Sequence, residues 1–200
     1  MRTEAEGLAS HAEGYDTKAI SQSSHAEGQN SKAEGLSSHA EGYDTAAEGS
    51  YSHTEGYNTK AIKQSSHAEG ESTTAQGNAS HAEGYWSTAT GSAAHAEGSN
   101  TKAEGNYSHA SGLYTTANAE AQTVVGKYNT SDLDQLFIVG NGTSSSAKSN
   151  AFTVDKNGNA VVKNNTTVGG KLILKETISY GTTLPSNPVE GQVFFLIPVQ

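Results

Sequence analysis

A five-residue motif that returns every 14 residues constrains this 200-residue chain more than any other feature. The motif first appears at 10–14 as Ser-His-Ala-Glu-Gly, and a weaker copy lies between successive motifs, as in Ser-Lys-Ala-Glu-Gly at 31–35. The motif contains all eight histidines of the protein: His11, His25, His39, His53, His67, His81, His95 and His109. A period this strict predicts a stack of similar structural units instead of a globular domain with one central core.

Glycine, alanine and hydroxyl residues follow a half-period of seven. Before residue 120, every glycine falls on a multiple of seven, from Gly7 to Gly112. Ser or Thr stands four residues before each such position except at Ala94, and Ala stands two residues before it except at Thr54. A coiled coil needs large apolar residues at two positions of each heptad, and collagen needs Gly at every third residue. Neither architecture fits this pattern.

A β-structure accounts for the pattern. In an extended Ser-His-Ala-Glu-Gly segment, Ser, Ala and Gly lie on one face, and His and Glu lie on the other. Two short strands in each 14 residues can enclose a narrow interior of small side chains, and the coils then stack at roughly 4.8 Å per turn through backbone hydrogen bonds. Glycines suit the corners, and inward hydroxyls can bond to the turn backbone. We therefore expect an all-β fold, a parallel β-roll of 14-residue coils followed by a small β-rich C-terminal region.

Residues 1–120 resemble the YadA-like head repeat of trimeric adhesins, whose motif is Ser-x-Ala-x-Gly in paired halves. The resemblance implies a left-handed parallel β-roll in which three chains pack side by side, so the chain's first partner would be itself in a homotrimeric fibre. The sequence departs from the family in one respect, because it has His and Glu where the family often has aliphatic residues.

The composition changes sharply after the repeat. No Val, Phe or Pro occurs before Val124, so the arm lacks the large apolar residues of a monomeric core, and association of chains would supply the missing burial. We predict a repeat arm at 1–121, a β-rich connector at 122–179, and a Pro-containing loop with a closing strand at 180–200.

Three details of the C-terminal parts follow from their turn residues and apolar runs. Asn157-Gly158 predicts a hairpin over 151–162 with a type I′ turn. A further short strand is expected at 171–174, and an apolar closing strand at 193–197. The connector resembles the small β-rich segments that follow such repeats in phage tail-fibre proteins.

The charge of the chain excludes several kinds of partner. Residues 1–120 carry sixteen Asp or Glu against six Lys or Arg, which argues against binding to nucleic acid or to anionic membranes. No segment approaches the ~20 apolar residues of a membrane helix, so we expect no membrane insertion. Without cysteine, the fold uses no disulfide.

The expected biological setting of the protein depends on two kinds of segment, a signal peptide and a membrane anchor, that we do not find in the sequence. The repeat begins directly after Met1 without the apolar stretch of a signal peptide, and no membrane anchor follows it. We therefore expect a virion protein, a phage tail fibre or appendage that contacts other tail or baseplate proteins. The alternative is the passenger fragment of a bacterial trimeric surface adhesin, located at the cell surface. A glycan-depolymerising enzyme is a third hypothesis.

The histidines and the acidic residues two positions later could carry chemistry. The acidic partners are Glu13, Glu27, Glu41, Glu55, Glu69, Glu83 and Glu97. Equally spaced copies argue against catalysis, which needs one constellation with distinct roles, so we predict no enzyme activity and no cofactor. We expect a trimer-interface ladder, stabilised in acid because Glu outnumbers His and would pair with charged His, with occasional metal binding left open.

Aromatic residues provide the candidates for ligand contact. Tyr15, Tyr43, Tyr57 and Tyr85 each follow a glycine at the same corner, and Trp86 lies beside the last of them. Such a column could stack against a host-surface glycan, or its rings could pack on the neighbouring coil.

Recognition of a host glycan or protein is expected mainly after Gly126. The irregular loops at 143–149 and 182–187 are not dictated by the packing of repeats, and loops on a rigid scaffold are common binding sites.

Overall fold

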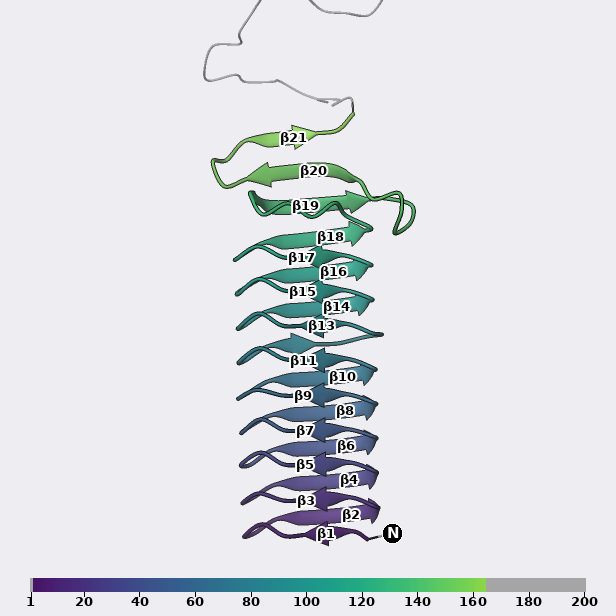
Figure 1. Ribbon diagram of the computed structural model, residues 1–200, viewed down its shortest axis with the longest axis vertical. Helices are drawn as coiled ribbons and strands as arrows, with labels where there is room; N and C mark the ends of the chain where they lie inside the picture. The colour runs from purple at the N-terminus through teal and green to yellow at the C-terminus, as the bar shows by residue number, and fades with distance from the viewer. Residues whose placement is uncertain (1, 165–200) are drawn as a thin grey trace, which may run out of the picture. The chain divides into compact units, whose positions relative to one another are not determined.

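The structure is a computed structural model that describes residues 2–164. These residues form an all-β parallel solenoid of about ten turns, each 14 residues long, followed by a small antiparallel region (Figure 1). The predicted fold class is thereby confirmed in its 14-residue coils and its β-rich end. The strands expected at 171–174 and 193–197, the part at 180–200 and the loop at 182–187 lie outside the described residues.

Each turn contributes one short and one long strand, and strands of each kind stack into their own sheet. The short-strand sheet contains β1 (Glu4–Ala5), β3 (Lys18–Ala19), β5 (Lys32–Ala33), β7 (Ala46–Ala47), β9 (Lys60–Ala61), β11 (Thr74–Ala75), β13 (Thr88–Ala89), β15 (Lys102–Ala103) and β17 (Thr116–Ala117). The long-strand sheet contains β2 (His11–Tyr15), β4 (His25–Gln29), β6 (His39–Tyr43), β8 (His53–Tyr57), β10 (His67–Glu71), β12 (His81–Ala82), β14 (His95–Ser99), β16 (His109–Leu113), β18 (Thr123–Lys127), β19 (Gln135–Asn141), β20 (Asn150–Asp155) and β21 (Ala160–Val162).

The interior of the solenoid consists of side chains no larger than threonine through residue 121. Strands pair in parallel between equivalent positions, as in His67 with His81 and Ala68 with Ala82. Ala68, Ala75 and the other alanines at these positions from Ala19 onward are fully buried, and so is Thr73. The larger buried side chains, such as Val124 and Ile138, occur only later in the chain. This confirms that the face of small residues points inward.

Inward hydroxyl groups satisfy backbone carbonyls at the corners, as the sequence predicts. Ser38 Oγ donates to the carbonyl oxygen of Gly35 at 2.8 Å, and Ser10, Ser24, Ser52, Ser66, Ser80 and Ser108 make the equivalent bond. Thr101 Oγ1 donates to Ser87 Oγ of the preceding coil at 2.9 Å. Small polar residues can therefore fill the interior with most of their hydroxyl groups paired, although Thr45, Thr54 and Thr59 have buried hydroxyl groups without a partner.

The corners use two kinds of left-handed residue, and the sequence indicates only one of them. Glycines at multiples of 14 have φ values between 95° and 116°, in line with their expected role. Two residues after every multiple of seven, from position 9 to position 128, a non-glycine residue also has positive φ. Asn, Asp, Ser and Ala occupy most of these positions, but aromatic residues such as Trp86 occupy some. Asn and Asp tolerate this conformation better than other side chains do.

The solenoid continues past the expected boundary at 121–122 without a break in the sheet. Strand β19 pairs with β18 in parallel at the same 14-residue offset, so Gly126 lies opposite Gly140. In this last part Gln122 takes the place of an inward serine, and its Nε2 atom donates to the carbonyl oxygens of Asp132 (2.8 Å) and Gln135 (2.7 Å). Within residues 2–164, we find no helix of the length and hydropathy needed to cross a membrane.

The predicted hairpin is confirmed between β20 and β21, but the predicted type I′ turn is wrong. A type I′ turn needs positive φ at both central residues, and Asn157 does not have it, whereas Gly158 has a φ of 82°. The amide of Gly158 donates to the carbonyl of Asp155 at 3.1 Å, and the amide of Asp155 donates to the carbonyl of Asn159 at 2.9 Å. The side chain of Asp155 accepts hydrogen bonds from the amides of Asn157 and Asn159, which favours this longer turn.

We predict that Gly56→Ala destabilises the fold by about 1–3 kcal/mol, because the residue has a φ of 104° and an added Cβ would overlap the carbonyl oxygen of Gly70. Thermal melting measures this effect. Lys63→Ala is the control. Position 63 belongs to the second set of glycine positions, the odd multiples of seven, and it already carries a side chain. Equal melting temperatures for the Gly56 variant and the wild type would contradict the role assigned to this corner.

Candidate functional site

The histidines of the repeat form one continuous column on the outer face of the long-strand sheet. Successive rings lie 4.7–4.9 Å apart between centroids, from His11 to His109. From His25 onward the ring planes are within 21° of parallel, whereas His11 meets His25 at 78°. The sheet itself fixes this arrangement, because equivalent residues of adjacent strands lie one strand spacing apart. We call this surface, with its glutamates, the His–Glu face.

The glutamates approach the histidine column in two different ways along its length. In the first coils, His Nε2 lies near the Glu two residues later, as in His25 to Glu27 at 3.3 Å. In the last coils, it lies near the Glu of the preceding coil, as in His95 to Glu83 at 3.3 Å. His67 stands at the crossover and has no carboxylate within ion-pair distance among the described residues. The predicted ladder residues therefore do come together, with a change of pairing that the sequence does not indicate.

Burial and the neighbouring rings disfavour protonation of His39, His67 and His81. Partial burial, followed by the charge of neighbouring histidines, lowers the pKa of His39 and His67 below the ordinary value. The same two causes lower the pKa of His81, although nearby glutamates act in the opposite direction. At these three positions the lowered pKa favours neutral rings, which is the opposite direction to the sequence-based expectation that acid stabilises the trimer-interface ladder; the melting experiment below distinguishes the two.

Three clusters on this face bring His and Glu ligand atoms within 4.8 Å of one another: His39–Glu41–His53, Glu69–His81–Glu83 and Glu83–His95–Glu97. Such donors are suitable for a transition-metal ion. However, all three clusters consist of ordinary members of the His–Glu ladder, and the last two share Glu83. No cluster is distinguished from its neighbours as a catalytic centre would be.

The predicted tyrosine column exists, but its members do not form one cluster. Tyr43 and Tyr57 lie on adjacent coils and stack with centroids 5.1 Å apart. Tyr15 and Tyr85 are separated from them by coils that carry Gln29 and Glu71 at this position. All four rings are more than 40% exposed.

Trp86 belongs to a different column, which the sequence analysis did not recognise. This corner column contains the left-handed residues two positions after the multiples of 14: Asp16, Asn30, Asp44, Asn58, Ser72, Trp86, Asn100, Tyr114 and Tyr128. Polar residues occupy its first five positions and aromatic residues three of its last four. Alignment of the chain in 14-residue rows would have revealed this change.

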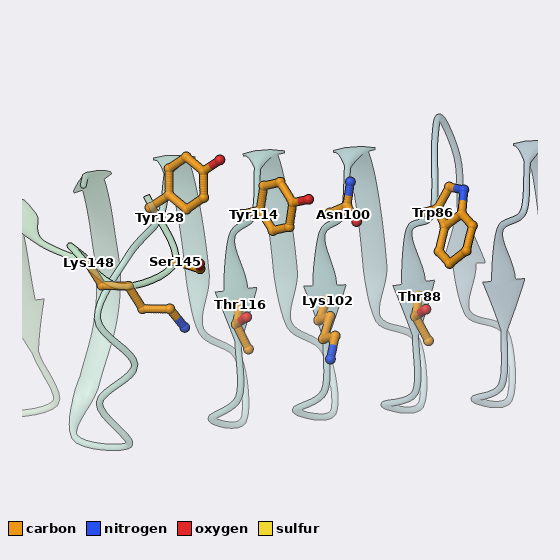
Figure 2. Close-up of a pocket in the computed structure, with 9 residues that line it drawn as sticks. All are labelled: Trp86, Thr88, Asn100, Lys102, Tyr114, Thr116, Tyr128, Ser145 and Lys148. Carbon is orange, nitrogen blue, oxygen red and sulfur yellow. The ribbon is translucent and has the colours of Figure 1, made fainter. Parts of the chain in front are cut away.

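The aromatic end of the corner column borders a groove of about 400 Å³. Figure 2 shows Trp86, Asn100, Tyr114 and Tyr128 in one row on successive coils. Tyr114 and Tyr128 stack with their centroids 5.0 Å apart and their planes 10° from parallel. Trp86 is 56% exposed and Tyr114 42% exposed, so these rings contribute little to the interior.

A second row of side chains and a loop complete this aromatic groove. Thr88, Lys102 and Thr116 project from the short-strand sheet, and Ser145 and Lys148 lie at one end (Figure 2). The loop that carries Ser145 and Lys148 continues the stack of coils. The amide of Gly142 donates to the carbonyl of Lys127 at 3.1 Å, and the amide of Ser149 donates to the carbonyl of Tyr128 at 3.0 Å. The predicted loop at 143–149 and Trp86, a member of the predicted aromatic set, thus line the same groove.

No protein-family model matches this chain, and no curated protein is significantly similar to it in sequence.

We expect the protein to melt at a lower temperature at about pH 5 than at about pH 8. Because the pKa of His39, His67 and His81 is lowered in the fold, the unfolded chain takes up protons first as the pH falls below the ~6.5 reference value. Stability is therefore greatest above that value and declines below it. Thermal melts with and without a chelator measure the change.

The triple variant with Gln at 39, 67 and 81 should show a smaller difference between the two pH values. His11→Gln is the matched control, because the His11 side chain at the end of the column is 61% exposed. A wild-type protein that is more stable in acid would contradict this account of the ladder, and a large loss on chelation would instead indicate a bound metal ion.

Proposed function

We propose that this chain is a non-enzymatic fibre protein that assembles as a homotrimer and serves as shaft and host-attachment segment of a phage tail. One observation carries the proposal: within residues 2–121, no fully buried side chain is larger than threonine. Such an interior buries little apolar surface for each residue ordered, so association of chains would add the missing burial. Long stacks of identical coils are also suited to span a distance instead of enclosing a catalytic pocket.

The His–Glu face is the surface we assign to the contact between chains. It is continuous over eight coils, and its imidazole and carboxylate groups can hydrogen-bond to symmetry-related copies. The Ser-x-Ala-x-Gly motif supports the finer description, a left-handed YadA-like roll with three chains side by side. The histidines and glutamates of the ladder then line the interface in place of aliphatic residues.

The proposed setting is the virion, where other tail or baseplate proteins hold the fibre and a host-surface glycan or protein is its target. The same coils would also suit the passenger segment of a bacterial trimeric adhesin. The neighbouring genes distinguish the two settings: tail and baseplate genes support the first, and a gene that continues into a membrane anchor supports the second.

Chemical cross-linking can test the interface because the chain contains no cysteine. We predict that His67→Cys, on the His–Glu face, gives covalent dimers with a short bifunctional maleimide. Thr74→Cys, on the outer face of the short-strand sheet, is the matched control and should give few. Sedimentation equilibrium of both variants should give about three times the chain mass of 20.7 kDa.

A folded monomer in sedimentation would contradict the trimer. Efficient cross-linking through residue 74 but not through residue 67 would contradict the assigned face and leave the trimer intact.

A further inference from the structure

We propose that the aromatic groove binds acidic oligosaccharides, with one sugar ring between Trp86 and Tyr114 and carboxylates of the glycan at Lys102 and Lys148. The inference rests on the attachment role proposed above and deepens it by naming the site and the class of ligand. Backbone conformation, ring spacing and charge support it independently.

The first support is that aromatic residues occupy backbone positions that favour Asn and Asp, although Trp86 and Tyr114 are largely exposed and do not fill the interior. Trp86, Tyr114 and Tyr128 have φ values of 56°, 52° and 44°, where Asn and Asp occur more readily than bulky residues. The N-terminal coils follow that preference, with Asp16 and Asn30 in the same column. Strained, exposed side chains that gather at one groove indicate a functional site.

Tyr107 supplies the comparison within the same chain. It has a φ of 58° and is 64% exposed, but it stands at the opposite corner and does not line the groove. Left-handed aromatics therefore do occur elsewhere, and the conformation alone does not define the site. The distinguishing feature of the groove is that three such residues lie within four successive coils.

The second support is the spacing of the rings. Rings on adjacent coils stack directly, as Tyr114 does on Tyr128 at 5.0 Å, and leave no space between them. Asn100 stands between Trp86 and Tyr114, so these two residues are two coils apart, roughly 9.6 Å at the usual strand spacing. A ring between two aromatic faces needs about 4 Å on each side. This spacing matches one puckered pyranose ring, and Asn100, with its smaller side chain, is the residue that stands between the two aromatic residues in the row (Figure 2).

The third support is the charge of the groove in an otherwise acidic protein. The chain has a formal net charge of −9, but the groove is lined by Lys102 and Lys148 and by no carboxylate. Both lysines are exposed, and the ion pairs within residues 2–164 include neither of them. At the N-terminal end of the same surface, in contrast, Lys18 and Lys32 stand beside Asp16 and Asp44. The aromatic end is thus suited to an anionic ligand that also presents ring faces and hydroxyl groups.

The groove remains accessible in the proposed assembly. Thr88, Lys102 and Thr116 lie on the outer face of the short-strand sheet, and the His–Glu face belongs to the other sheet, across the buried alanines. A trimer joined through the His–Glu faces would display three grooves, and weak single sites would then gain avidity on a polymeric glycan.

The single tryptophan of the chain makes the groove directly observable. Full-length protein is titrated with acidic hexasaccharides of galacturonate, mannuronate and hyaluronan, while Trp86 fluorescence and binding heat are recorded. Maltohexaose serves as the neutral sugar, and hexaglutamate and a thymidine hexanucleotide serve as polyanions without sugar acids. We expect at least one acidic hexasaccharide to shift Trp86 emission and to bind about tenfold more tightly than every control ligand.

The variants are chosen from residues that the same columns already hold. Tyr114→Asn and Lys102→Thr should each weaken binding about tenfold, and Lys102→Thr should also reduce the preference for acidic over neutral sugar. Neither should greatly lower the melting temperature, because Asn suits the left-handed corner, the Tyr114 ring lost from the stack on Tyr128 is exposed, and Thr88 and Thr116 flank Lys102 in its column. Tyr107→Asn is the matched control and should leave binding within about twofold of the wild type.

The proposal is overturned if no acidic hexasaccharide binds, if maltohexaose binds equally well, or if hexaglutamate or the oligonucleotide does. An equal loss in Tyr107→Asn and Tyr114→Asn also overturns it. Sedimentation of the same samples separates the two proposals: a trimer that binds no sugar removes the groove and leaves the fibre, whereas a monomer that binds removes the fibre and leaves the groove.

Discussion

The parallel pairing of each residue with the one 14 positions later is the constraint on which the rest of this structure depends. Once strands stack at about 4.8 Å, every side chain has its own equivalents directly above and below it. The interior is then as narrow as two short strands allow, and only Ala, Ser, Thr and Gly fit, as Ala26 and Thr17 illustrate. The inward serines of the long-strand corners donate hydrogen bonds to the corner backbone, so most of this polar interior is satisfied, with Thr45, Thr54 and Thr59 as exceptions.

The same constraint converts the sequence into columns on the surface. A residue type that recurs every 14 positions forms a ladder on the surface, such as the histidines stacked at 4.7–4.9 Å. The stacking thereby places like groups next to one another whether or not they attract. Neutral imidazoles tolerate this arrangement, which is why the pKa of His67 is lowered by burial and by its neighbour. A departure from the repeat is correspondingly informative, because nothing in the stack requires it. The change from Asp and Asn to Trp86 and Tyr114 in the corner column is such a departure.

Much of the fold follows from the sequence because a strict period leaves few arrangements. The inward alanines, the corner glycines and a hairpin over 151–162 were predictable from spacing and turn residues, although the type of its turn was not. The extension of the stack through β19 was not, because Val124 and Ile138 replace the alanines that mark the repeat, while only Gly126 and Gly140 preserve its spacing. The exchange of glutamate partners near His67 depends on side-chain rotamers, and spacing carries no information about them.

The candidate site was visible in the sequence only in part. Trp86 drew attention as an aromatic residue beside Tyr85, but it belongs with Tyr114 and Tyr128, which stand 28 and 42 residues later. The contribution of Lys148 depends on the path of an irregular loop, which no repeat predicts.

A structure of the full-length protein determined with a bound acidic hexasaccharide would test the central claim most directly. The account predicts three chains with their His–Glu faces turned inward and a sugar ring above Asn100 in each outward groove. A structure with the His–Glu faces in solvent and the grooves buried between chains would contradict it.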